Sequence, residues 1–184
     1  MPKQHRILLA TVGSPSAQAA FAAAAKFPWP PASRAQAVVA RSRWLPAVFE
    51  ETRAATEASF KGIADEARCV LASRWPEAKT VFIDESPGDA ILGEAARFKA
   101  SLIVLGWRGH GTFRRLLADS VSRSVAARAQ CPVLVVREPA KAVRRFVVGF
   151  DGGPNSEHAL EFLSSLENGR GNLLPVGGPV RSGL

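Results

Sequence analysis

Short runs of uninterrupted apolar residues, each followed by a segment with helical character, constrain the fold of this chain most strongly. The run at 102–105, Leu-Ile-Val-Leu, is the clearest, because it places no polar residue on either face of a strand. Such strands are typical of parallel sheets that helices cover on both sides. Similar runs at 7–11, 35–40, 80–83 and 132–136 alternate with predicted helices. The sequence therefore predicts an α/β fold, a doubly wound, mainly parallel five-stranded sheet with helices on both faces.

The segments between these runs carry the helical pattern. Gly-Ser-Pro-Ser at 13–16 supplies a turn and a helix cap for the alanine-rich segment 17–26. From 46 to about 75, apolar or small residues recur at spacings of three, four and seven, which indicates an amphipathic helix. Two shorter helices are expected at 90–99 and 119–129.

The length and charge of the chain limit its class. With 184 residues, 47% hydrophobic and 22% charged, the chain has globular composition and room for one ordinary domain with a remainder, but not for two. The formal net charge of +8 suits either polyanion binding or simple solubility. Because the arginines are scattered along the chain, solubility is the favoured interpretation.

The cysteines and the N-terminal region indicate a cytoplasmic protein. Cys69 and Cys131 are too few for a disulfide scaffold, and their apolar neighbours favour reduced core thiols. The apolar run that starts at Ile7 is interrupted after six residues by the turn at 13–18, which favours strand, turn and helix over a secretory signal. No stretch approaches a membrane span, so no membrane partner is expected.

The chain starts to repeat itself near its C-terminal end. Residues 145–160 align without gaps with residues 6–21, matching a strand, a Gly-x-Pro turn and the start of a helix. We therefore divide the chain into a domain at 1–138, a linker with the first strand and helix of an incomplete second copy at 139–166, and a flexible tail at 167–184. One strand and one helix cannot bury a core alone, so this second copy must dock on the first domain, pair with another chain or stay partly mobile.

A glycine-rich loop follows the fourth predicted strand. Gly-Trp-Arg-Gly-His-Gly-Thr at 106–112 leaves the strand end, and Asp119-Ser120 then opens a helix. Backbone N–H groups at such a helix start bind phosphate, so phosphate binding is the first hypothesis. The alternative is a glycine-rich turn that only lets the backbone bend. The loop matches neither the P-loop nor the dinucleotide-binding pattern.

This region resembles the universal stress protein family. The family pattern G-x2-G-x9-G-[ST] precedes a helix and a Cys-Pro-Val-Leu-Val-Val strand, and residues 102–137 follow it closely. Residues 4–138 as a whole resemble one such domain, and 145–166 resemble the opening of a second. The resemblance implies an adenine nucleotide alpha hydrolase-like fold, an ATP-type nucleotide as the cofactor, and a homodimer formed through the strand at 132–136.

The resemblance also implies site residues. Gly106, Gly109 and Ser120 match the family's glycines and its hydroxyl residue. Arg41 would lie beside adenine at the end of the second strand, and Thr11 ends the first strand next to the position of the family's nucleotide-binding aspartate.

Two positions depart from the family pattern. Val12 stands where the aspartate is expected, which removes a polar partner for the nucleotide. Asp119 replaces the third glycine, adding a side chain and a negative charge at a helix start, where it can also act as an N-cap. Both changes predict a weakened nucleotide site.

We therefore expect a regulatory or binding module of the stress response, with an unidentified protein partner. The alternative within the same class is a working ATP binder that tolerates both substitutions. The sequence has no nucleophile–base pair, no metal-ligand spacing and no arranged carboxylate pair, so neither an enzyme nor a metal protein is expected. A nucleic-acid-binding protein is the remaining alternative, because residues 108–128 are rich in arginine, but no reading module accompanies them.

The tail at 167–184 provides a direct test of the domain division. It contains seven Gly or Pro residues and no apolar periodicity, so packing cannot offset the entropy of ordering it. Deleting it should leave the melting temperature nearly unchanged in differential scanning calorimetry. A fall of many degrees would show that the tail is packed.

Overall fold

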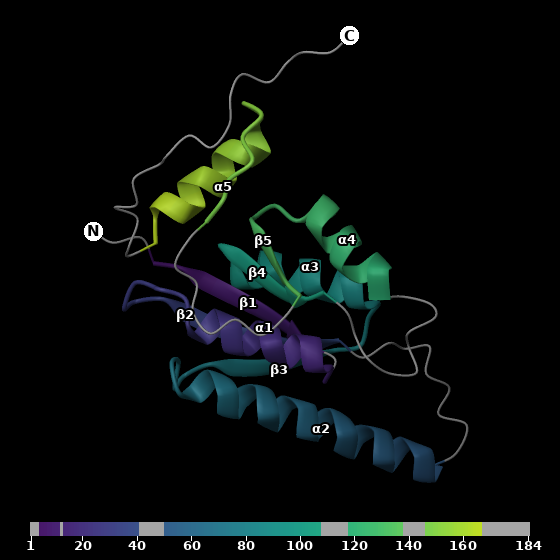
Figure 1. Ribbon diagram of the computed structural model, residues 1–184. Coiled ribbons are helices and arrows are strands. Elements are labelled where there is room, and N and C mark those ends of the chain that lie inside the picture. Colours follow the sequence, from purple (N-terminus) through teal and green to yellow (C-terminus); the bar gives the residue numbers. More distant parts are fainter. Residues whose placement is uncertain (1–3, 12, 41–49, 108–117, 138–145, 167–184) are drawn as a thin grey trace.

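The computed structural model describes residues 4–11, 13–40, 50–107, 118–137 and 146–166. Strands and helices alternate along the chain (Figure 1). The elements in chain order are β1 (Arg6–Thr11), α1 (Pro15–Ala25), β2 (Arg34–Ala40), α2 (Glu50–Ala72), β3 (Lys79–Ile83), α3 (Pro87–Phe98), β4 (Leu102–Gly106), α4 (Ala118–Arg128), β5 (Val133–Val136) and α5 (Pro154–Ser164). Each of the five strands predicted within 1–138 is present.

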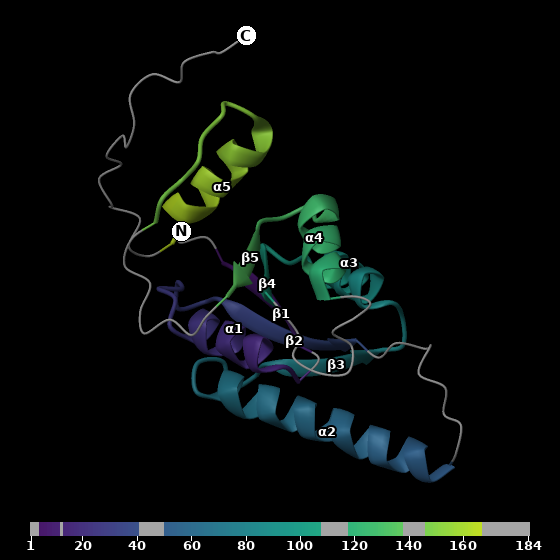
Figure 2. The same ribbon diagram turned by 45° about the vertical axis from the view of Figure 1, so that its right-hand side comes forward.

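The five strands form one parallel sheet in the order β3-β2-β1-β4-β5. The α/β prediction of a doubly wound parallel sheet is therefore confirmed. Helices α1 and α2 cover one face, and α3 and α4 cover the other (Figures 1 and 2). Strand β5, at the position predicted for 132–136, lies at an edge of the sheet.

The core consists of two apolar clusters, one on each face of the sheet. Ile7 and Leu9 of β1 point toward α1 and α2, where Trp29 and Leu71 are also fully buried. The alternate residue Leu8 points to the opposite face and packs with residues of α3 and α4. Because successive side chains of a strand point to opposite faces, an unbroken apolar run is what a doubly covered strand requires.

The prediction of two core thiols is wrong for one cysteine. Cys69 is exposed, because α2 turns Ala64, Ala67 and Leu71 toward the sheet and leaves position 69 on its outer surface. Cys131 is half-buried against the cluster under α3 and α4, and burial raises the pKa of its thiol. Both thiols are free.

The strand predicted at 145–150 is also wrong. Residues 146–150 belong to no strand of the structure, whereas the helix that the repeat predicts after them is present as α5. The reason is that a strand is defined by a hydrogen-bonded neighbour, and the described chain supplies none here. None of the described helices is both long and apolar enough to cross a membrane.

Helix α5 docks on the first domain through its C-terminal end. Leu166 is buried in the core cluster beneath α1 and α2, and the ring of Phe162 lies 5.4 Å from the ring of His5. The hydroxyl of Ser165 lies 3.2 Å from Nε2 of His5, just before β1. The docking site is therefore at the amino ends of the strands. The tail predicted at 167–184 lies outside the described residues.

This docking predicts that Leu166 contributes to the stability of the whole domain. Leu166→Ala should lower the free energy of unfolding by about 2 to 3 kcal/mol, because it removes a side chain that is 5% exposed. Glu161→Ala, at an exposed position of the same helix, is the control and should change it by less than about 0.5 kcal/mol. Urea denaturation measures both. If both variants change the free energy of unfolding by equally small amounts, α5 does not unfold together with the domain.

Candidate functional site

The carboxyl ends of β1 and β4 form the switch point of the sheet. These two strands are neighbours, and the helix after β1 covers one face of the sheet while the helix after β4 covers the other. In open α/β sheets, ligands bind in the crevice outside the strand ends at this position. The residues predicted for the nucleotide site come from the segments that meet there.

The turn after β1 is held by its own side chains. Gly13 has a φ of +75°, which an L-residue rarely adopts. The Thr11 hydroxyl accepts a hydrogen bond from the Gly13 N–H at 3.0 Å, and the Ser14 hydroxyl accepts one from the Ala17 N–H at 3.2 Å. The predicted turn and cap are confirmed, and Ser14 already satisfies one donor of the first turn of α1.

Gly106 lets β4 approach the start of α1 very closely. A Cβ atom at this position would lie 2.5 Å from the carbonyl carbon of Ser16 and 2.7 Å from the backbone nitrogen of Ala17. Backbone atoms cannot yield as a flexible side chain can, so only glycine fits. The first glycine of the family pattern therefore has a packing role, which its spacing in the sequence does not reveal.

The first turn of α4 lies beside the end of β4. The described part of the helix begins at Ala118, so Asp119 and Ser120 are the second and third residues of α4. Asp119 therefore lies inside the helix and is not its N-cap. The first N–H groups of a helix have no acceptor within the helix itself. The hydroxyl of Ser122 donates to the Gly106 carbonyl at 3.3 Å and ties the helix to the strand.

Trp107 extends the site toward the edge of the sheet. Its backbone N–H donates to the Val136 carbonyl at 2.8 Å, and the guanidinium of Arg137 lies 4.7 Å from the centre of its ring. The indole Nε1 is buried and has no hydrogen-bond partner among the described residues. This pairing could not be predicted from the sequence, because Trp107 and Arg137 follow different strands.

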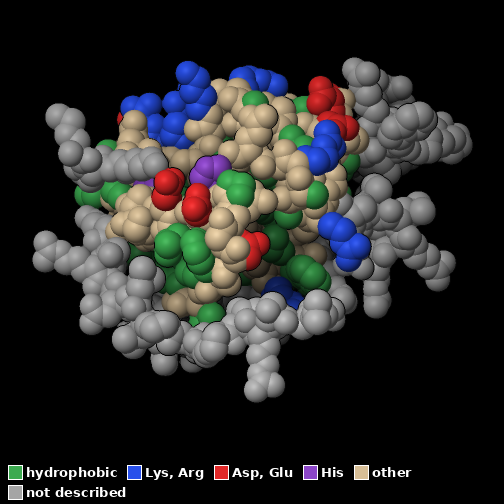
Figure 3. Space-filling view, turned by 90° about the horizontal axis from the view of Figure 1, so that it is seen from above, with side chains coloured by type: hydrophobic (Ala, Val, Ile, Leu, Met, Phe, Trp, Pro, Cys, Tyr) green, Lys and Arg blue, Asp and Glu red, His purple; other side chains and the backbone are tan. Residues whose placement is uncertain are grey.

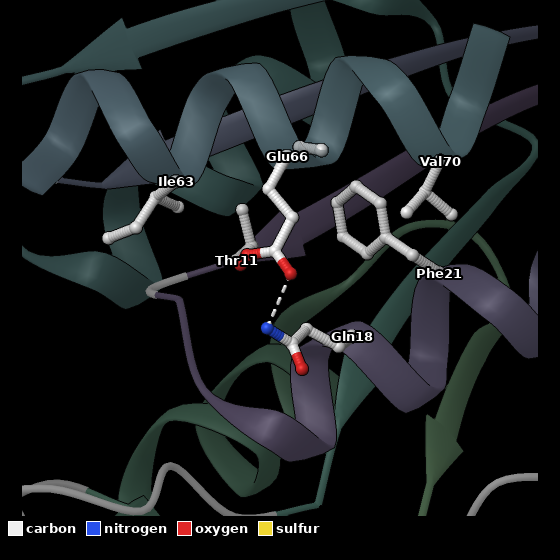
Figure 4. A pocket seen from close by; sticks show the side chains of 7 residues that line it. Thr11, Gln18, Phe21, Ile63, Glu66 and Val70 are labelled. Carbon is white, nitrogen blue, oxygen red and sulfur yellow. Dashed lines mark hydrogen bonds between the residues drawn. The ribbon is translucent and has the colours of Figure 1, made fainter.

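A small pocket lies between α1 and α2, next to the end of β1 (Figure 4). Thr11 lines it together with Gln18, Phe21, Ile63, Glu66, Ala67 and Val70. The Gln18 amide donates to the Glu66 carboxylate at 2.6 Å across it. Its volume of ≈ 10 Å³ admits about one water molecule and no nucleobase.

The structure describes four of the seven predicted site positions. Gly106 ends β4, Asp119 and Ser120 belong to α4, and Thr11 ends the neighbouring strand β1. The other predicted residues, Val12, Arg41 and Gly109, lie outside the described residues, as do Arg108, His110, Arg114 and Arg115. Within the described ranges, no three His, Cys, Asp or Glu side chains are grouped to hold a metal ion.

Asp151, the aspartate of the second copy, accepts hydrogen bonds from residues of the turn in which it lies. One carboxylate oxygen accepts hydrogen bonds from the Ser156 hydroxyl at 2.7 Å and from the Gly153 N–H at 2.9 Å. Both hydrogen bonds lower the pKa of this exposed carboxyl, and the bond from the Ser156 hydroxyl has a larger effect than the bond from the Gly153 N–H. The turn before α5 is therefore held without a ligand.

The close packing at Gly106 predicts a sharp contrast between two glycines. Gly106→Ala should lower the free energy of unfolding by about 2 to 4 kcal/mol, because the added methyl group meets backbone atoms of α1. Gly93→Ala, on the exposed side of α3 with nothing within 4 Å, should raise it by about 0.5 to 1 kcal/mol. Denaturant unfolding checks both. A neutral Gly106→Ala would contradict the packing role.

Comparisons with known proteins agree with this architecture. The model of the universal stress protein family matches residues 4–137. A universal stress protein of Thermus aquaticus is 44% identical over 62 residues, and the protein YxiE of Bacillus subtilis is 35% identical over 75 residues. These matches cover 34% and 41% of this chain and 45% and 51% of the relatives, so the chain spans about half the length of the curated relatives that it matches.

Solved structures share the fold. The universal stress protein UspA of Lactobacillus plantarum is 26% identical with a TM-score of 0.59, and the match covers 73% of this chain and 99% of that one. A universal stress protein crystallised in complex with cAMP is 23% identical with a TM-score of 0.56, over 73% of this chain and 97% of that one. The family model spans most of the chain, and the chain belongs to the universal stress protein family.

Proposed function

We propose that this protein is a regulatory or binding module of the stress response with a nucleotide site at the carboxyl ends of β1 and β4. Its ligand is an adenine nucleotide of the ATP type, and Val12 and Asp119 weaken the site. The protein binds its ligand and does not catalyse a reaction. It works in the cytoplasm, where both thiols stay reduced.

The meeting of the first turn of α1 and of α4 with the end of β4 at Gly106 is the observation that carries this proposal. The first turn of α1 packs on Gly106, and Ser122 of α4 donates to the Gly106 carbonyl. Free N–H groups and the positive end of the helix dipole make such a position favourable for phosphate. The cAMP complex of a protein with the same fold is consistent with a nucleotide at such a site.

Asp119 opposes the same ligand. Asp119 is the second residue of α4, and its carboxylate adds a negative charge near a helix start, where a phosphate would otherwise be favoured. At about 4 Å, its repulsion of a phosphate charge is about 1 kcal/mol in water and about 4 kcal/mol at a dielectric typical of a protein surface. Either energy weakens binding appreciably, because about 1.4 kcal/mol corresponds to a tenfold change in Kd.

The edge position of β5 supports a homodimer as the form in which the module works. The strand carries only apolar residues, Val-Leu-Val-Val, and pairs with β4 on one side alone. An open apolar edge is a template for another strand. We therefore propose that a second copy of the chain covers it.

Calorimetric titration with ATP tests the site. The unmodified chain should bind weakly, and Asp119→Gly should strengthen binding by about tenfold or more by removing the charge and the side chain. Asp119→Asn separates the two effects, because it removes only the charge. Glu157→Gln removes one negative charge from the first turn of α5 and should leave binding unchanged.

The double variant Val12→Asp with Asp119→Gly should bind most tightly, because it also restores the polar partner after β1. Tight binding by the unmodified chain would contradict the weakened site. Absence of binding by the double variant would contradict the nucleotide site itself.

A further inference from the structure

Five basic side chains from separate parts of the sequence lie together at the amino ends of the strands. Three come from the first residues of β1, β2 and β3, and two come from the last turn and the C-cap of α3. We call them the amino-end cluster, which consists of Arg6, Arg34, Lys79, Arg97 and Lys99. Figure 3 shows Lys and Arg side chains gathered at the upper left of the face seen from above. A concentration of one charge attracts ligands of the opposite charge.

The pairing of the strands brings the first three side chains together. Arg6 of β1 is the direct neighbour of Arg34 on β2. Lys79 of β3 is the direct neighbour of Gln36, two residues further along β2. Paired residues, and residues two apart on one strand, point to the same face of a sheet, and neighbouring strands lie about 4.8 Å apart. Because Leu8, two residues after Arg6, packs with residues of α3, the three basic side chains form a row on the face that α3 covers.

The end of α3 completes the cluster. The guanidinium carbon of Arg6 lies 4.8 Å from the centre of the Phe98 ring, in the last turn of the helix. One oxygen of the Glu94 carboxylate accepts a hydrogen bond from the Gln36 amide at 2.5 Å. The other oxygen lies 3.0 Å from Nη1 of Arg97. These contacts hold the C-terminal end of α3 against the starts of β1 and β2, so the basic residues of the helix lie beside those of the strands.

The positive charge of the cluster is not neutralised within the described part of the chain. Its one ion pair there joins Arg97 to Glu94, whose side chain is 5% exposed. The other four members form no ion pair with another described residue. Nε of Arg6 is buried and has no hydrogen-bond partner among the described residues either. The cluster therefore carries uncompensated positive charge.

Local roles account for some of these residues only. The dipole of α3 favours cations at its C-terminal end, which explains Arg97 and Lys99. Lys79 lies on the edge strand β3, where a charged side chain prevents pairing with another sheet. Neither reason applies to Arg6 and Arg34, which lie on inner strands and repel each other as direct neighbours. An anion that bridges them would remove this repulsion.

We propose that the amino-end cluster binds the phosphate backbone of a nucleic acid strand. Guanidinium groups bind phosphate oxygens through two parallel hydrogen bonds, and ammonium groups bind them as point charges. The formal net charge of +8 also favours the approach of a polyanion. A row of cations about 4.8 Å apart suits a strand that carries one charge per nucleotide, and a mononucleotide would contact only part of the row.

A protein or a membrane fits this surface less well. The centre of a protein interface is depleted of charged residues and rich in aromatic ones, and a membrane surface binds an apolar helix face. The aromatic ring within the cluster, Phe98, already packs against Arg6. The proposal does not depend on nucleotide binding at the carboxyl ends of the strands, because the cluster lies at their opposite ends.

Fluorescence anisotropy of a labelled single-stranded RNA of mixed sequence, titrated with the full chain at several salt concentrations, tests this proposal. Each phosphate contact of a single strand adds about 0.7 to the slope of log Kd against the logarithm of the salt concentration. Contacts with about three to five phosphates should therefore give a slope of about 2 to 4. Arg34→Gln combined with Lys79→Gln should raise Kd by about tenfold or more and lower the slope by about 1.4.

Lys61→Gln combined with Arg68→Gln is the matched control, because it removes the same charge from exposed positions of α2, on the other face of the sheet. Salt screens such distant charges, so the control should change Kd by less than about twofold. The melting temperature shows that both double variants are folded. Equal weakening by the two would show that binding follows net charge alone and would overturn the proposal. Absence of binding at low salt would also overturn it, as would tighter binding to poly-glutamate or to anionic lipid vesicles than to the RNA.

Discussion

The burial of β1 and β4 on both faces determines the rest of this structure. Residues Ile7 to Leu9 and Ile103 to Val104 have no exposed surface, which requires a helix layer on each side of the sheet. This requirement places the two strands side by side at the centre, with the chain leaving them toward opposite faces. The topology therefore makes the carboxyl ends of β1 and β4 the switch point, the position at which open α/β sheets bind their ligands.

The contact at Gly106 links this architecture to the site. The end of β4 packs on the first turn of α1, and Ser122 of α4 donates a hydrogen bond to the Gly106 carbonyl. We propose that backbone groups near this junction hold a phosphate and that Asp119 lowers its affinity. In this account, a chain can keep the family's fold and lose ligand affinity through one or two substitutions.

Much of the fold could be predicted from the sequence, because apolar periodicity reports burial directly. The five strands of the sheet follow from their apolar runs, and the helix start at Ser14 follows from its capping chemistry. The exposure of Cys69 follows from the helical period, because Ala64, Ala67 and Leu71 define the buried face of α2 and position 69 lies opposite to it. The apolar neighbours of Cys69 in the sequence do not report this, since adjacent residues of a helix point in different directions. The missing strand at 146–150 has a different cause, because pairing depends on a neighbour and not on the strand's own residues.

The packing around the predicted site could not be predicted from the sequence. The close approach of Gly106 to Ser16 and the pairing of Trp107 with Arg137 join residues that are far apart in sequence. Only the register of β4 between β1 and β5 brings them together.

A nuclear magnetic resonance titration of the backbone amides with ATP tests the central claim most directly, because it detects weak binding and locates it. The account predicts shifts that saturate only at high ligand concentration and that cluster at Gly13, Gly106 and Ser120, with the amino-end residues His5 and Ser165 unaffected. Shifts centred on the amino ends of the strands, or none at any concentration, would contradict a nucleotide site at the switch point.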